Sequence, residues 1–261
     1  MDKTEILALY DRDLREHAVP DGPGARVERV GQVVRQIADP HGWNGVLWSG
    51  LDEAGADAAI REQIACFTAL GQDFEWKLYS HDRPADLGAR LTAAGFRAEP
   101  AETLMIGEID RLDLAARLPE GVRLVAVVDE AGVGLFTEIH EKAFGTDGTR
   151  MRRRLLDQLA ADPGAMVAVV ALAGTEPVSA ARMELVPGTP FAGLWGGGTA
   201  EEWRGRGLYR GLVAHRARVA AARGCRYLQV DASPMSRPIL ERLGFLPLST
   251  TTPYLYEAKG N

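Results

Sequence analysis

The stretch from residue 194 to residue 211, LWGGGTAEEWRGRGLYRG, decides the fold. It holds six glycines and three arginines between an apolar run and a predicted helix. Glycine lets backbone N–H groups approach a ligand closely, and the start of a helix carries a partial positive charge. The stretch therefore predicts a loop that binds a phosphate group.

Two common phosphate-binding motifs do not fit this loop. Gly205, Gly207 and Gly211, followed by Asp231, imitate the fingerprint of a dinucleotide-binding fold. In that fold the glycines follow the strand directly, whereas TAEEW intervenes here, and too few residues remain after Asp231 for the further βα units. A Walker A loop needs Gly–Lys–Ser/Thr, which the sequence lacks.

The segments around the loop alternate between predicted strands and helices. Before it, helices are expected over 129–143 and 149–160, and strands over VRLVAVVDE, GAMVAVVALAG, EPVSAARMELV and TPFAGLWGGG. After it, the order is a helix (GLYRGLVAHRARVAAARG), a strand (CRYLQVDAS), a short helix (SRPILERLGF) and two closing strands, LPLS and TPYLYEA.

The first part of the chain repeats this order. FEWKLYSHDRPADLGARLTAAGF (74–96) and RYLQVDASPMSRPILERLGF (226–245) both read as a strand, a polar loop with proline, a short helix and Gly–Phe. We expect one domain over 1–118 and a second over 119–261. The matching loop of the first copy, LDEAGAD (51–57), carries three carboxylates and no cation, so only the second copy is expected to bind phosphate.

Three motifs in the second copy resemble the GNAT acetyltransferase superfamily. RGRGLY is similar to its pyrophosphate motif, Arg/Gln-x-x-Gly-x-Gly/Ala, in which Arg204 and Gly207 match and Tyr209 departs. TAEEWRGRG resembles the lead-in to that motif, and RPILERLGF resembles the helix beside the thiol end of the cofactor. The resemblance implies an α/β (α+β) fold of two GNAT-like units, each a mixed, mostly antiparallel sheet flanked by helices. The N-terminal unit would be a degenerate, structural copy.

The same resemblance implies acetyl-CoA as co-substrate. Its pyrophosphate would lie on the loop, and its pantetheine arm would run along a bulged strand that the glycines at 196–198 suit. A backbone N–H there would polarise the thioester carbonyl. The expected cofactor contacts are Gly197, Gly198, Thr199, Arg204, Gly205, Arg206, Gly207, Leu208, Tyr209 and Ser236.

The residues that move protons are less clearly marked. In the family a tyrosine four residues before the glycine of Gly–Phe protonates the leaving thiolate, but this chain has Leu240 there. Glu138 and His140 are candidates for the group that deprotonates the amine, and Tyr254 is a candidate for the missing acid. Surface exposure for Glu138 and core packing for His140 and Tyr254 remain the alternatives. Trp195 and Glu184 are expected beside the acceptor.

Composition limits partners and location. The net charge of −6 argues against nucleic acid and against an anionic membrane surface as partners. No apolar run approaches eighteen residues and the first residues lack a signal-peptide core, so a cytoplasmic protein is expected. Cys66 and Cys225 are expected to be core thiols, and no metal-ligand spacing is present.

The sequence favours an N-acetyltransferase that moves an acetyl or other short acyl group to the amine of a small molecule or peptide. The alternative is a non-catalytic acyl-CoA-binding or regulatory module that kept the cofactor loop. A purely structural α/β protein is a third reading. Either a monomer or a homodimer is compatible with the sequence.

Overall fold

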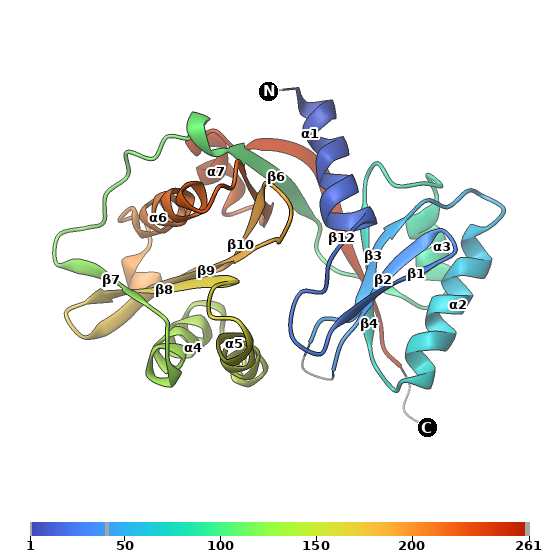
Figure 1. Ribbon diagram of the computed structural model, residues 1–261, viewed down its shortest axis with the longest axis horizontal. Helices are drawn as coiled ribbons and strands as arrows, with labels where there is room; N and C mark the ends of the chain where they lie inside the picture. The colour runs from blue at the N-terminus through green and yellow to red at the C-terminus, as the bar shows by residue number, and fades with distance from the viewer. Residues whose placement is uncertain (1, 40–41, 259–261) are drawn as a thin grey trace. The chain divides into compact units, whose positions relative to one another are not determined.

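The computed structural model describes residues 2–39 and 42–258, which form two compact units (Figure 1). Unit 1 contains the described residues within 1–104, 231–234 and 247–261, and unit 2 contains 105–230 and 235–246. The chain therefore leaves unit 1, builds unit 2 and returns to unit 1 at its end. These limits differ from the expected boundary at residue 118, and the division into domains 1–118 and 119–261 stays a prediction.

Unit 1 is a sheet covered by helices. Its elements are α1 (Lys3–Tyr10), the π-helical turn η1 (Asp11–Glu16), β1 (Arg26–Val30), β2 (Val33–Ile37), β3 (Gly45–Ser49), α2 (Ala56–Ala69), β4 (Phe74–Tyr79), α3 (Leu87–Ala93), β5 (Arg97–Ala98) and β12 (Leu246–Tyr256). The strand order is β1-β2-β3-β4-β12, with β5 beside β12. Strands β3 and β4 pair in parallel, and α2 connects them.

One strand, β12, replaces the two closing strands that the sequence predicted. Proline cannot donate to a strand ladder, yet Pro247 and Pro253 both lie within this strand. The strand continues because β4 pairs with it from Thr251 to Tyr256, on both sides of Pro253.

The core of unit 1 lies between its sheet and the helices α2 and α3. Ile60 and Phe67 of α2 and Leu91 of α3 pack against Trp76 and Phe74 of β4, all of them buried. Phe67 and Phe74 stack with their ring centroids 4.2 Å apart. The alternation along FEWKLY places Phe74 and Trp76 on this face.

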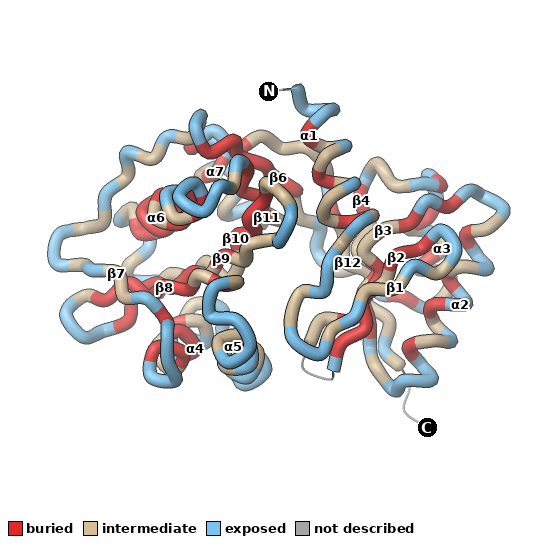
Figure 2. The backbone as a smooth tube through the Cα atoms, viewed as in Figure 1, coloured by how far each residue is buried: buried red, intermediate tan, exposed pale blue. Residues whose placement is uncertain are grey.

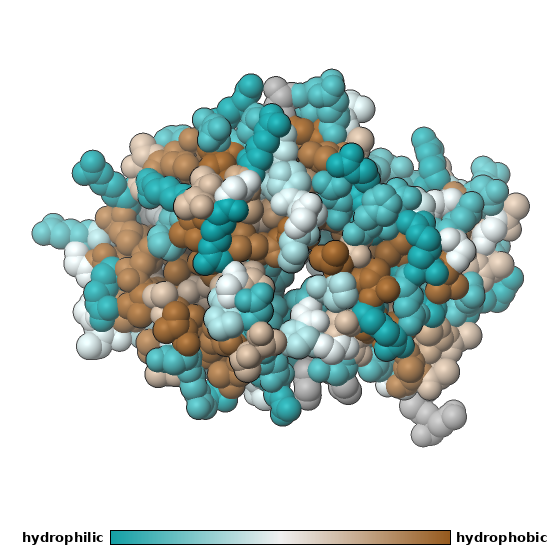
Figure 3. Space-filling view, in the orientation of Figure 1, coloured by the Kyte–Doolittle hydropathy of each residue, from teal (hydrophilic) through white to brown (hydrophobic). Residues whose placement is uncertain are grey.

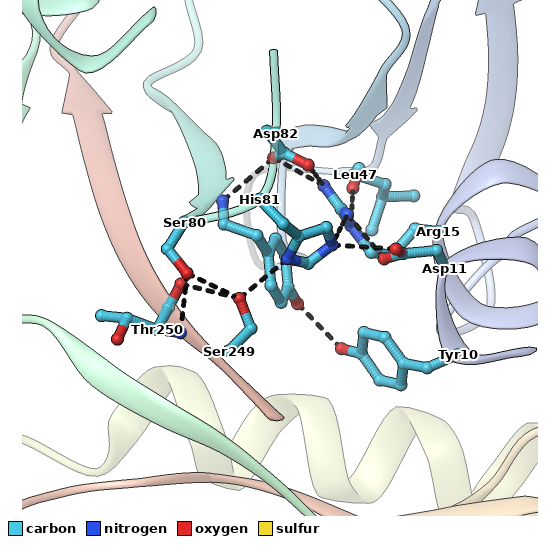
Figure 4. Close-up of polar contacts among 10 residues, drawn as sticks. Tyr10, Asp11, Arg15, Leu47, Ser80, His81, Asp82, Ser249 and Thr250 are labelled. Carbon is cyan, nitrogen blue, oxygen red and sulfur yellow. Dashed lines mark hydrogen bonds and ion pairs between the residues drawn. The ribbon is translucent and has the colours of Figure 1, made fainter. Parts of the chain in front are cut away.

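The N-terminal segment is fastened to unit 1 by polar side chains (Figure 4). Arg15, whose side chain is 3% exposed, donates to both carboxylate oxygens of Asp82 at 2.8 and 2.7 Å and to Asp11 at 2.7 Å. His81 lies 2.8 Å from Asp11 through Nε2 and 2.8 Å from Ser249 through Nδ1. Helix α1 and η1 are therefore held by buried charge as well as by apolar contact.

Unit 2 contains most of the second predicted copy. Its elements are β6 (Glu102–Glu108, which begins in unit 1), η2 (Ile109–Arg111), β7 (Val122–Ala126), α4 (Glu130–Phe144), α5 (Thr149–Ala161), β8 (Met166–Ala173), β9 (Glu176–Leu185), β10 (Phe191–Thr199), η3 (Glu201–Trp203), α6 (Leu208–Ala222), β11 (Tyr227–Ala232, which ends in unit 1) and α7 (Arg237–Leu243). The strand order is β6-β11-β10-β9-β8-β7.

The sheet of unit 2 is buried on both faces (Figure 2). Ala168 and Val170 of β8 face the cluster formed with α4 and α5, whereas Val169 packs with Leu212 of α6 on the other face. A strand covered on both sides reads as a continuous apolar run, which explains MVAVVALA. On the face that Figure 3 draws, hydrophobic side chains over unit 2 lie among hydrophilic ones.

The predicted fold class is confirmed. The pairs β7/β8, β8/β9 and β9/β10 are antiparallel, whereas β10 and β11 are parallel and are connected by α6. Unit 1 has the same plan, with β1/β2 and β2/β3 antiparallel and β3/β4 parallel. Each unit is thus a mixed, mostly antiparallel sheet flanked by helices.

Candidate functional site

Strands β10 and β11 separate after a short parallel contact. Within the residues that the structure describes, their pairing covers Phe191–Gly193 and Tyr227–Gln229, while β10 continues to Thr199. From residue 194 to residue 199, the edge of β10 on this side is therefore not paired with β11. Its backbone groups are available to an extended ligand, as an added strand would use them.

A bulge in β10 occurs on this free edge. Trp195 pairs with Arg182 of β9 and Gly198 pairs with Ala180, so two residues of β10 oppose one of β9 between them. Gly196 has a φ of 58°, a conformation that favours glycine. The predicted bulge at the three glycines is present.

Close packing explains why Gly197 and Gly198 carry no side chain. A Cβ on Gly198 would lie 2.8 Å from Phe144 of α4, and a Cβ on Gly197 would lie 3.1 Å from the ring of Tyr209 on α6. The predicted contact residue Thr199 ends β10, and its hydroxyl lies 2.8 Å from the hydroxyl of Ser179. This hydrogen bond fixes the end of the strand from which the loop departs.

The loop then turns into α6 through two glycines with left-handed backbones. Gly205 has a φ of 75°, and Gly207, the N-cap residue, has a φ of 87° and provides no side-chain cap. The first N–H groups of α6, beginning with Leu208 and Tyr209, therefore have no capping side chain. Donors that lack an intrahelical partner at a helix start form an anion-binding site.

Two arginines of the loop lie beside these donors. Arg204 donates to the carbonyl oxygens of Thr199 and Ala143, each at 3.3 Å, and remains exposed. Arg206 lies over the ring of Trp203 at 4.7 Å. Neither guanidinium has a carboxylate partner among the residues that the structure places, so both charges can serve a phosphate.

The remaining predicted cofactor residue, Ser236, contacts Tyr209. Ser236 is the N-cap residue of α7, and it forms a hydrogen bond with the Tyr209 side chain. Burial raises the pKa of Tyr209, although the charge of Arg216 and the bond with Ser236 oppose the rise. The structure thus brings the predicted residues of β10, the loop, α6 and α7 to one place in unit 2.

His140 lies on the other side of the bulge, on α4. Its ring centroid is 4.7 Å from that of Phe144, and its Nε2 is 3.5 Å from the hydroxyl of Thr146. Its Nδ1 is buried with no hydrogen-bond partner in the described part of the chain. Burial and the nearby charge of Arg182 lower its pKa, so the imidazole is neutral at pH 7. A neutral imidazole can accept a proton, while burial and the charge of Arg182 make this ring a weaker base than an exposed histidine.

Neither of the other two predicted catalytic residues shares the buried face of α4 with His140. Glu138 is exposed on α4, two residues away and hence on another face of the helix. Tyr254 is on β12 in unit 1, where it packs against the aromatic core and its hydroxyl lies beside Gly88. Their catalytic roles stay predictions.

A group of charges near the bulge was missed by the sequence analysis. Glu184, which had been expected there, forms ion pairs with Arg182 and with Arg154 of α5, the latter at 3.6 Å. Arg216 of α6 is buried and donates to the carbonyl oxygen of Arg182 at 2.8 Å, and none of the carboxylates in the described part of the chain pairs with it. Arg182 could have been found as the one cation in the strand EPVSAARMEL, whereas residue type alone does not distinguish the buried Arg216 from the exposed Arg210 and Arg218 of α6.

Over residues 2–39 and 42–258, three or more His, Cys, Asp or Glu side chains nowhere gather in a way that could hold a metal ion. None of the helices in these ranges is both long enough and apolar enough to cross a membrane.

Comparison with known proteins agrees with this geometry. Residues 133–245 match the model of the acetyltransferase (GNAT) family. No curated protein matches the chain. Among solved structures, a GCN5-related N-acetyltransferase from Kribbella flavida is 19% identical with a TM-score of 0.72, covering 99% of this chain and 96% of its own.

Two further structures share the fold along most of the chain. A tandem GNAT protein from the clavulanic acid biosynthesis pathway is 16% identical with a TM-score of 0.64, and the match covers 93% of this chain and 86% of that one. A GCN5-related N-acetyltransferase from Sphaerobacter thermophilus is 16% identical with a TM-score of 0.62, and the match covers 90% and 83%. The chain thus has the fold of GNAT N-acetyltransferases over its whole length.

Proposed function

We propose that this protein, which carries a GNAT acetyltransferase domain over residues 133–245, transfers an acetyl or other short acyl group from acyl-CoA to an amine. The observation that carries the proposal is the separation of β10 from β11 beside a helix start that has no side-chain cap and lies next to Arg204 and Arg206. This arrangement fits a cofactor with a pyrophosphate and a long thiol-bearing arm. The N-terminal unit would be a degenerate copy with a structural role.

Each part of the site has a physical task. The N–H groups at the start of α6 and the guanidinium groups of Arg204 and Arg206 hold the pyrophosphate. The free edge of β10 aligns the arm, and a backbone N–H at the bulge donates to the thioester carbonyl oxygen as negative charge develops there. Acetyl-CoA supplies the acyl group as an activated thioester.

The acceptor amine must lose a proton before or during its attack, because an amine with a pKa near about 10 is mostly protonated at pH 7. His140 suits this task, since its buried Nδ1 is neutral and has no partner among the described residues. Placing amine and thioester together contributes most of the rate, because effective molarities reach about 10⁵–10⁸ M.

Leu240 favours one alternative function. It occupies the position where the family has its acid, and it is fully buried in unit 2 with 0% exposure. A protein that has lost this acid can act as a non-catalytic acyl-CoA-binding or regulatory module. Turnover separates the two functions, because only an enzyme releases free thiol from acetyl-CoA when amines are present.

Calorimetric titration with CoA tests the cofactor site. We expect one equivalent per chain, and we expect Gly207→Glu to abolish binding because it adds a negative charge and a side chain at a φ of 87°. Two equivalents, or unchanged affinity in this variant, would contradict the proposal. Gly174→Glu is a matched control, since Gly174 also has a positive φ but has open space around it in the β8–β9 turn.

The pH dependence of the rate tests the proton-transfer groups. We expect His140→Ala to lower the rate about 10²- to 10⁴-fold, the usual contribution of a positioned acid or base. Glu138→Gln and Tyr254→Phe test the other two predicted residues, and Leu240→Tyr tests whether the missing acid limits the rate. Unchanged pH–rate profiles in the first three variants would refute all three assignments.

A further inference from the structure

Tyr209 contacts both the unpaired part of β10 and the segment that follows β11. Its backbone belongs to the first turn of α6, its ring rests on Gly197 of the bulge, and its hydroxyl bonds to Ser236 at the start of α7. One side chain therefore connects the free edge of β10 with the segment that follows β11.

The contact with Gly197 is close because Gly197 has no side chain. The position that its Cβ would occupy is 3.1 Å from Cε2 of Tyr209 and 3.7 Å from Cδ2. The ring thus packs on the face of β10 at Gly197, within the part of the strand that β11 leaves unpaired. A ligand that runs between β10 and the segment after β11 at this point meets the Tyr209 side chain, which contacts both.

The bond to Ser236 holds the ring in this position. Burial raises the pKa of Tyr209, so the phenol keeps its proton at neutral pH and donates or accepts a neutral hydrogen bond. Such a bond adds only a small net stability to a protein, because the same groups can bond to water instead. It is therefore strong enough to favour one rotamer and weak enough for a ligand to break.

We propose that Tyr209 and Ser236 form a latch over the opening between β10 and β11, which the thiol-bearing arm of CoA must displace in order to bind. The inference rests on the function proposed above and adds a residue that controls its cofactor. Only the fraction of molecules with an open latch binds, so the apparent dissociation constant is the intrinsic one divided by that fraction.

Two ligands and two kinds of variant test the latch in the full chain. CoA carries the arm, whereas ADP carries a pyrophosphate without it. By calorimetry we expect Tyr209→Ala to bind CoA about five- to tenfold more tightly, the factor that one net hydrogen bond represents. Tyr209→Phe and Ser236→Ala remove only the bond and are expected to change CoA affinity in the same direction. ADP affinity is expected to stay within about twofold throughout.

Tyr227→Phe is the matched control. It removes the same hydroxyl from a tyrosine of unit 2 that packs on Phe191 at the paired end of β11, and it should leave both affinities unchanged. Weaker CoA binding in Tyr209→Ala, or equal shifts for CoA and ADP, would overturn the latch. Equal CoA affinity in all variants would overturn the latch alone. If neither the wild type nor any of the variants binds CoA, both the proposed function and the latch are overturned.

Discussion

Replacing Arg15 by glutamine should remove a large share of the stability of unit 1. The Arg15 side chain is almost fully buried and makes two hydrogen bonds to Asp82, one to Asp11 and one to the carbonyl oxygen of Leu47 at 3.1 Å. Asp82, whose side chain is 5% exposed, would be left without its cation. Removing one partner of a buried ion pair costs about 3–5 kcal/mol, against a total of about 5–15 kcal/mol for a typical protein.

Urea unfolding at pH 7, followed by circular dichroism, measures this loss. Arg12→Gln is the control, because Arg12 pairs with Asp13 at the surface, and it should change the midpoint little. In Arg15→Gln/Asp82→Asn a neutral amide replaces the buried carboxylate of Asp82, so the double variant should be more stable than Arg15→Gln alone. If Arg15→Gln loses less than about 1 kcal/mol, the buried pair does not hold the N-terminal segment and the reasoning fails.

The same network predicts how stability changes with pH. Burial would raise the pKa of Asp11, but hydrogen bonds from His81 and Arg15 outweigh it and leave the pKa lowered. A lowered folded-state pKa gives stability that is present above the unfolded value, about 3.9, and is lost as the pH falls through the folded value. This acid-side loss should be smaller in Arg15→Gln.

Two further substitutions test other parts of the structure. Gly198→Ala places a Cβ 2.8 Å from Phe144 and 3.0 Å from Ala143, so it should lower the free energy of unfolding by about 1–3 kcal/mol and weaken CoA binding. Gly134→Ala, in open space on α4, should raise the free energy of unfolding by about 0.4–1 kcal/mol in the same urea titration. Equal effects of the two substitutions would contradict the packing argument. Burial and the charge of Asp231 raise the pKa of Glu102 to about 7, so wild type should lose stability between pH 4.5 and 8, and Glu102→Gln should be the more stable protein at pH 8 but not at pH 4. Parallel pH profiles for the two proteins would refute this origin.

The sequence predicted the elements of unit 2 well because their signals are local. Gly205 and Gly207 mark the loop, Pro238 marks the first turn of α7, and the apolar run at 166–173 marks a strand buried on both faces. Each of these depends on residues within a few positions of each other. Periodicity and turn chemistry were therefore sufficient.

Contacts between distant residues could not be predicted in this way. Tyr209 and Ser236 are 27 positions apart, and nothing in either segment indicates that the two hydroxyls meet. The pairing of β12 with β4 joins residues more than 170 positions apart, which placed Tyr254 in a different unit from His140. Strand pairing over such distances depends on which edge is free once the other elements have formed.

Because β12 belongs to unit 1 but comes after unit 2 in the sequence, the pairing of β4 with β12 is delayed during protein synthesis. Strand β4 pairs with residues 251–256, which leave the ribosome only after all of unit 2 has been made. At about 5–20 residues per second, the interval from β4 to β12 is on the order of 10–30 s. During this time the strand FEWKLY, with Phe74 and Trp76 on its core face, has a free edge, which is the kind of template that promotes aggregation. Production of this protein in cells should therefore depend on chaperones that shield a nascent strand edge, more than its final stability would indicate.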